Sequence, residues 1–282
     1  MHPIEHLRYV ARARGADPAS LVRETAHALS SMRFDPAGLV VACRRIVERH
    51  PDCGPLWWLC ARLLTAADPF TAAWEIADEI ADDPTATVLA RALPDDATVV
   101  TIGWPDLAGA ALARRGDVTV LAVDSRHEAS AFVQRLERHD VACDIVPAEG
   151  LAAAVGAADQ VVIEALAVSP CRLLGPPGTT AAALLGRHLD VPVWLVVGVG
   201  RSLPDDYVAA MAGRASDEPW NRDHDVLAVD DHDGRDQLGP ITHLVRPGGV
   251  TRIPGGDGAS SEPVRLEADC PMAPELLRSS PI

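Results

Sequence analysis

Lysine is absent from this sequence, and all 25 basic residues are arginine. Its absence excludes every mechanism that needs a lysine side chain, including Schiff-base catalysis, a lysine general base and the lysine of a phosphate-binding P-loop. Aromatic residues are also few, with 3 Phe, 2 Tyr and 6 Trp in 282 residues. The bias toward Arg, Ala, Asp and Pro is typical of a GC-rich genome.

Paired cysteine motifs and long apolar runs are missing as well. The six cysteines form no CxxC pair and no compact framework, so we expect reduced thiols in a cytoplasmic protein. No stretch of about 18 apolar residues occurs, and the first residues do not follow the pattern of a secretion signal. We therefore expect neither secretion nor a membrane span.

Acidic residues outnumber basic ones by 40 to 25, which gives a formal charge of -15. A chain of this charge is unsuited to nonspecific binding of nucleic acid or anionic membranes. The 48% hydrophobic and 23% charged residues are ordinary for a globular protein that buries a full core. The composition therefore favours a small molecule or another protein as the partner.

Residues 1–93 carry apolar side chains at helical spacing. The stretches that this spacing predicts as helices are 18–33, 36–50, 55–67 and 69–81. Asp17 is a plausible N-cap, Pro18 suits a first helical turn, and Pro51 ends the second helix. We predict a small helical domain over 1–93.

From Pro94 the pattern changes to short β-branched runs that alternate with helical stretches. Strands are predicted at 97–103, 118–123, 141–146, 159–163 and 191–197, and helices at 105–115, 127–139, 150–156 and 179–189. This alternation predicts an α/β fold, a Rossmann-like doubly wound parallel sheet over 94–282. Residues 213–263 are polar, with the pieces VLAV and ITHLV as possible added strands, and 274–278 is predicted as a short closing helix.

Ligands of such sheets bind beyond the carboxyl ends of the strands, so the residues that follow each strand are candidates. The first strand leads into Gly103-Trp104-Pro105-Asp106 and the second into Asp124-Ser125-Arg126-His127. Asp124 suits a ribose hydroxyl, although a turn acceptor is an equal alternative. Only Gly103 and Gly109 fall where a GxGxxG fingerprint would lie, which disfavours a nicotinamide or flavin cofactor.

Two further segments contain residues that could bind an ion. Gly175-Pro176-Pro177-Gly178-Thr179-Thr180 precedes a helix, so its backbone amides could hold a phosphate, or Thr179 could simply be the N-cap. The Asp and His residues of 223–233 match no recognised metal site, and a solvated acidic loop is favoured there. We expect no cofactor and no metal.

Several phrases resemble the translation initiation factor 2B alpha/beta/delta family. They are Ser125-Arg126, the Ala-Asp entry at Asp159, Gly178-Thr179 before a Val-Pro strand, and the closing box with Asp269, Pro274, Glu275 and Leu276. That family includes methylthioribose-1-phosphate and ribose-1,5-bisphosphate isomerases. The resemblance implies a helical domain followed by a Rossmann-like domain.

The resemblance also implies roles for single residues. Asp159 matches the catalytic aspartate of the isomerases and Arg126 the arginine of their second strand end. Gly103 stands where the isomerases have a cysteine, and Pro176-Pro177 replaces their Asn-Lys. The remaining candidates for an anion clamp are Arg172 and Arg201.

These matches and losses leave three functions open. The first is a regulatory or non-catalytic protein that binds a sugar phosphate or nucleotide, and the second is a divergent isomerase that uses Asp159 with Cys171, Glu164 or His127. The third is a structural subunit of a larger assembly. We expect a homodimer through the strands after 190, and one cleft that gathers the residues Asp124, Arg126, Asp159, Gly178 and Thr179.

Overall fold

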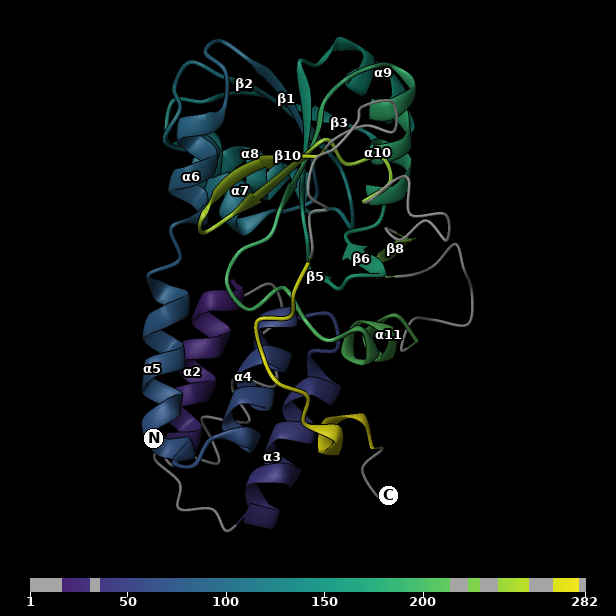
Figure 1. The fold of residues 1–282 in the computed structure, drawn as a ribbon. Coiled ribbons are helices and arrows are strands. Elements are labelled where there is room, and N and C mark those ends of the chain that lie inside the picture. The colour runs from purple at the N-terminus through teal and green to yellow at the C-terminus, as the bar shows by residue number, and fades with distance from the viewer. Residues whose placement is uncertain (1–16, 31–35, 214–222, 229–237, 254–265, 279–282) are drawn as a thin grey trace.

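The computed structural model describes residues 17–30, 36–213, 223–228, 238–253 and 266–278. Its amino-terminal part is the predicted bundle, made of α2 (Pro18–Ser30), α3 (Pro36–Arg49), α4 (Gly54–Thr65) and α5 (Pro69–Ala81). Asp17 caps α2, because its carboxylate accepts a hydrogen bond from the Ser20 amide at 2.8 Å. Asp68 caps α5 in the same way. In Figure 1 this bundle lies below the sheet.

The second part is built on a seven-stranded sheet, and the predicted fold class is confirmed. Its strands are β1 (Thr98–Ile102), β2 (Thr119–Val123), β3 (Ala142–Val146), β4 (Gln160–Glu164), β7 (Val193–Val196), β9 (His243–Arg246) and β10 (Gly249–Arg252). The order across the sheet is β10-β9-β7-β4-β1-β2-β3, and only β10 runs antiparallel to its neighbour. The pieces VLAV and ITHLV fall on β8 (Asp225–Ala228) and β9, so both contribute a strand.

Helices cover both faces of this sheet, as a doubly wound fold requires. On one face α6 (Thr85–Ala92), α7 (Asp106–Leu112) and α8 (Ala129–Glu137) form a core with the strands, in which Leu89, Leu112 and Phe132 are fully buried. On the other face lie α9 (Leu151–Ala157) and α10 (Thr179–His188). The side chains of the central strands β1, β4 and β7 therefore alternate between two apolar layers, whereas the edge strands β3 and β10 are largely exposed.

The helices α6 and α11 (Asp205–Gly213), the strand β10 and a small antiparallel sheet, apart from its strand β8, were not predicted. The sheet consists of β5 (Ala167–Val168), β6 (Arg172–Gly175) and β8. The closing helix is present as a 3₁₀ turn, Pro274–Leu277. No helix of the described residues is long and apolar enough to cross a membrane.

The two parts share their packing. The bundle core contains Tyr207 and Met211 of α11 and Leu276 of the closing turn, whereas α6, which lies before residue 94, packs on the sheet. Tyr207 Oη donates a hydrogen bond to the Ala273 carbonyl at 3.0 Å, and this bond ties the carboxy-terminal segment to α11. The division at residues 93 and 94 stays a prediction.

Candidate functional site

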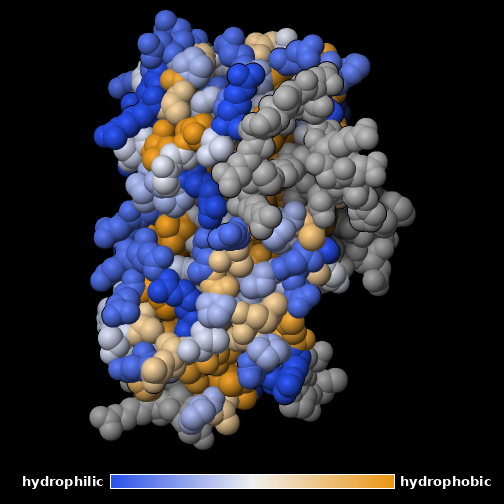
Figure 2. Space-filling model, in the orientation of Figure 1, coloured by the Kyte–Doolittle hydropathy of each residue, from blue (hydrophilic) through white to orange (hydrophobic). Residues whose placement is uncertain are grey.

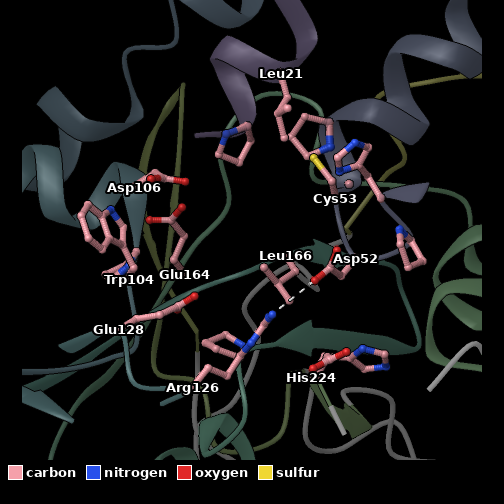
Figure 3. Close-up of a pocket in the computed structure, with 18 of the residues that line it drawn as sticks. Leu21, Asp52, Cys53, Trp104, Asp106, Arg126, Glu128, Glu164, Leu166 and His224 are labelled. Atoms are coloured by element: carbon pink, nitrogen blue, oxygen red, sulfur yellow. Dashed lines mark ion pairs between the residues drawn. The ribbon is translucent and has the colours of Figure 1, made fainter. Parts of the chain in front are cut away.

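A cavity of about 780 Å³ lies between the carboxyl ends of the parallel strands and the bundle. The sheet side contributes the residues that follow β1, β2 and β4, and the bundle side contributes the start of α2 and the turn between α3 and α4. In Figure 3, Trp104, Asp106, Glu164, Glu128 and Arg126 form one wall, opposite Asp52, Cys53 and His224. The strand-end rule therefore locates one half of the cavity, and the helical part supplies the other.

The wall beyond β1 is shaped by a sharp turn. Gly103 has a φ of +65°, a backbone conformation that residues other than glycine rarely adopt. The chain then passes Pro105 and enters α7 at Asp106, so the Trp104 ring and the Asp106 carboxyl both line the cavity. Trp104 packs against Phe132 of α8 at 6.1 Å between ring centroids and stays 36% exposed.

The turn after β2 brings Arg126 and His127 to the cavity. Both residues have positive φ, 60 and 62, and the Glu128 amide donates to the Ser125 carbonyl at 3.3 Å. These angles define a type I′ turn, which favours Asn or Gly at the two central positions. Neither residue here is of that kind, so the backbone is strained at the site.

Arg126 spans the cavity toward the helical part. Its guanidinium lies 3.7 Å from the Asp52 carboxylate, and its side chain is 44% exposed. An ion pair this long and this exposed contributes little stability. Arg126 is therefore a cation that an incoming anion can recruit at small cost.

Glu164 and Arg201 form a buried ion pair in the cavity wall. The two side chains are 6% and 5% exposed, and their atoms Oε1 and Nη2 are 2.7 Å apart. The second carboxylate oxygen of Glu164 accepts a hydrogen bond from the Ala108 amide at 2.9 Å, and Arg201 also donates to the Ala165 carbonyl. Each group of this pair therefore has its charged partner within the chain itself.

Burial raises the pKa of three other cavity groups, Asp106, Cys53 and Glu128. Desolvation and the negative charge of Glu164 raise the pKa of Asp106 to about 7. Desolvation raises the pKa of the Cys53 thiol to about 12, so this cysteine is unreactive near neutral pH. Asp106 is thus a cavity acid whose charge changes near pH 7.

The structure brings only part of the predicted site together. Arg126 and Arg201 line the cavity, as do the alternative partners Glu164 and His127. Asp124 lies just behind this wall, where its carboxylate accepts from the Ala129 amide at 3.2 Å, the turn-acceptor role.

Asp159 lies at the opposite edge of the sheet. It precedes β4, whose amino end points away from the cavity, and its carboxylate accepts a hydrogen bond from the Thr98 amide at 2.7 Å. Arg126 and Glu164 follow the carboxyl ends of their strands, so Asp159 does not share a cleft with them. The family resemblance matched this aspartate by its position in the sequence. In the structure it precedes β4 and therefore lies at the amino end of the strand, away from the cavity.

Arg172 and the phosphate-cradle residues are occupied by carboxylates of the chain. Arg172 forms a two-bond pair with Asp205, at 3.1 and 3.0 Å, outside the cavity. The amides of Gly178 and Thr180 both donate to one Asp225 carboxylate oxygen, at 3.0 and 3.1 Å. Asp225 therefore sits where the sequence predicted a phosphate. Cys171, in the turn between β5 and β6, does not line the cavity.

The bundle contributes cavity residues that sequence reasoning missed. Asp52 and Cys53 occupy the turn Pro51-Asp52-Cys53-Gly54 between α3 and α4, where the only sequence signal was a helix break. Of the 223–233 segment, Asp223 and His224 line the cavity, and residues 229–233 lie outside the described part of the chain. No group of three or more metal-ligating side chains occurs among the described residues.

No protein-family model matches the sequence, and no curated protein matches it either. Solved structures do. Translation initiation factor eIF-2B of Pyrococcus horikoshii OT3 is similar with a TM-score of 0.68 and 13% identity, over 89% of this chain and 97% of that one.

Two structures from Chaetomium thermophilum agree with this result. The tetrameric eIF2B-beta2-delta2 complex matches at TM-score 0.67 and 16% identity, over 88% of this chain and 90% of that one. The eIF2B beta subunit matches with a TM-score of 0.63 and 15% identity, over 89% of this chain and 88% of that one. The chain thus has the fold of the eIF2B alpha/beta/delta family, as the sequence resemblance predicted.

Proposed function

We propose that this chain is an eIF2B-like protein that binds a small phosphorylated sugar or a nucleotide in the cavity, without converting it. The observation that carries this proposal is the cavity itself, which opens at the carboxyl ends of β1, β2 and β4 and carries Arg126 on its wall. Its volume of about 780 Å³ lies within the range of small-molecule sites. Ligands of doubly wound sheets bind at this edge.

Arg126 is the proposed phosphate contact. A guanidinium offers a planar fork of donors that matches phosphate oxygens, and the long Arg126–Asp52 pair is easily exchanged for a phosphate. The other two candidate arginines are committed, Arg201 to Glu164 and Arg172 to Asp205. Arg49 also lines the cavity, so Arg126 and Arg49 are the guanidinium groups that remain for a phosphate.

The remaining walls suit a sugar or a nucleoside. The Trp104 ring offers a partly exposed face for a base or a sugar ring. The carboxylates of Glu128 and Asp52 can accept hydrogen bonds from ligand hydroxyls. Such a surface recognises hydroxyls and one flat group together, which fits a nucleoside monophosphate or a pentose phosphate.

The divergent-isomerase hypothesis is not favoured. Asp159, its proposed catalytic residue, hydrogen-bonds the backbone at the far edge of the sheet. Gly103, in the position of the isomerases' thiol, offers no proton donor, and the Cys53 thiol in the cavity has a pKa of about 12. Turnover of methylthioribose 1-phosphate or ribose 1,5-bisphosphate in a coupled assay would reverse this conclusion.

Membership of a larger assembly is a second candidate function. One structure similar to this chain is a tetrameric complex, and the face in Figure 2 carries hydrophobic residues over the helical part. Val41 of α3 and Leu277 of the closing turn are 44% and 37% exposed. Light scattering tests the homodimer: the monomer mass of 29.9 kDa at all concentrations would contradict it.

A thermal-shift panel of pentose phosphates and nucleoside monophosphates tests the binding function. A ligand at a hundred times its dissociation constant adds about 2.7 kcal/mol to the stability, which is a shift of several degrees. Arg126→Ala should weaken the affinity for the ligand by tenfold or more. Arg138→Ala, at an exposed position outside the cavity, should leave the affinity unchanged. If no compound of the panel shifts the melting temperature, the proposal is contradicted.

A further inference from the structure

The Asp106 carboxyl lines the cavity, and no hydrogen-bond or ion-pair partner for it lies among the described residues. Asp106 is the first residue of α7. Its neighbour Glu164 differs, because both oxygens of that carboxylate are already bonded, one to Arg201 and one to the Ala108 amide. A partly buried carboxyl with unused bonding capacity is the kind of group that a ligand completes.

The surroundings of Asp106 decide which protonation state it takes. Glu164 and Asp106 face each other in Figure 3, and two ionised carboxyls at close range in a desolvated wall repel. Glu164 is paired with Arg201 and accepts from the Ala108 amide, whereas Asp106 has no such partner among the described residues, so Asp106 is the member of the pair that accepts the proton. The Arg201 charge also acts on Asp106 and lowers its pKa, but less than burial and Glu164 raise it, and the weaker effects of Asp17 and Arg135 oppose each other in sign.

The start of α7 weakly favours an ionised Asp106, but the helix has only seven residues. The Ala108 amide in its first turn already donates to Glu164. Burial and the fixed charge of Glu164 therefore outweigh the helix, and the pKa of Asp106 rises to about 7.

We propose that Asp106 is a ligand-binding residue that holds a proton in the complex and donates it in a hydrogen bond to a hydroxyl, ring or phosphate oxygen of the sugar. The proposal rests on the proposed function and adds to it how the ligand is recognised. A protonated carboxyl is a donor, whereas an ionised one only accepts and repels a phosphate. Together with Arg126, it gives the cavity another group that can donate to an oxygen-rich ligand.

Binding is then coupled to protonation. Well below pH 7 Asp106 already carries its proton and adds no pH dependence to the Kd. Above pH 7 the free protein loses the proton and must take it up again on binding, so the Kd rises up to tenfold for each pH unit. The second ionisation of a phosphate, near pH 6, acts on all variants alike and cancels in their comparison.

Isothermal titration calorimetry with the best ligand of the panel, at pH 6, 7 and 8 in two buffers of different ionisation enthalpy, tests this coupling. The wild type should bind about fivefold more weakly at pH 8 than at pH 7, with proton uptake. Asp106→Asn keeps a donor without titrating, so its affinity should stay near the wild-type value at low pH and its proton uptake should vanish. Asp106→Leu should bind at least tenfold more weakly at every pH.

Asp144→Asn on β3, an exposed site outside the cavity, is the matched control and should behave as the wild type. Wild-type binding that shows the same pH dependence as Asp106→Asn overturns the inference but leaves the proposed function intact. Unchanged affinity in Asp106→Leu also overturns it. If no panel ligand binds the wild type, the proposed function fails and this inference fails with it.

Discussion

Carboxylates of the chain occupy most of the groups that could hold an anion. Glu164 forms an ion pair with Arg201, and Asp205 forms one with Arg172. Asp225 accepts hydrogen bonds from the amides at the start of α10. The sequence predicted these arginines and amides as candidates because their types are right, but it could not predict their partners. Each partner lies more than 30 residues away, on a loop or on elements that only the folded structure brings close.

The ionisation of Asp106 predicts a pH dependence of stability. Its pKa is higher in the folded protein than in the unfolded chain, so its stabilising contribution is complete below about pH 4 and is lost as the pH rises through 7. The free energy of unfolding of Asp106→Asn, relative to that of the wild type, should therefore increase by roughly 2 kcal/mol between pH 5 and pH 8, after allowance for partial exposure. Urea unfolding at both pH values measures this, and a constant difference would contradict it.

The buried pair of Glu164 and Arg201 predicts a large loss of stability. Arg201→Met leaves the Glu164 charge buried without its partner, which costs about 3–5 kcal/mol. Arg172→Met is the matched control, because the Arg172–Asp205 pair is about one-third exposed and should cost only about 1 kcal/mol. Chemical denaturation of both variants compares them, and equal losses would refute the distinction.

Among the elements, the turn after β2 combines strain with function. His127 has a φ of 62° and a side chain that is 99% exposed. Its imidazole therefore contributes little stabilisation to offset the strain of the backbone. His127→Gly should stabilise the protein by about 1 kcal/mol, because glycine adopts this conformation without a penalty.

Ala131→Gly in the neighbouring helix α8 gives the matched comparison. Ala131 lies inside a regular helix, where glycine costs about 1 kcal/mol. Thermal unfolding should therefore show opposite shifts for the two substitutions. A loss of stability in His127→Gly would mean that the imidazole makes a contribution that the strain argument leaves out.

Elements with a strong local signal were predictable, and those that depend on distant partners were not. The helical period gave α2 to α5, and β-branched runs gave β1 to β4 and β7. The strands β5 and β6 are only two and four residues long, and β6 pairs with β8 about 50 residues later. Asp159 was misplaced because it enters β4, whereas Glu164, at the end of the same strand, faces the cavity.

On the scale of the whole molecule, the cavity exists because two parts meet. The strand-end rule predicted the sheet wall, but the turn with Asp52 and Cys53 comes from the bundle, whose docking no local pattern encodes. Long-range hydrogen bonds hold this arrangement: the Trp58 indole and the Arg44 guanidinium both donate to carbonyls of the carboxy-terminal segment, Asp269 and Glu275.

The net charge of -15 predicts a dependence of stability on salt. An excess of carboxylates repels itself in the compact state, and the screening length falls from about 10 Å at 0.1 M to about 3 Å at 1 M. The melting temperature should therefore rise by several degrees between 0.1 and 1 M KCl. Scanning calorimetry measures this rise, and a fall with added salt would contradict the charge argument.

The crystal structure of the protein with the tightest-binding phosphorylated sugar or nucleotide tests the central claim most directly. We predict the ligand inside the cavity, its phosphate within hydrogen-bond distance of the Arg126 guanidinium and a sugar oxygen on Asp106, with Asp225 still bound to the amides before α10. A ligand seated elsewhere, or one whose phosphate displaces Asp225 and leaves Arg126 paired with Asp52, would contradict this account.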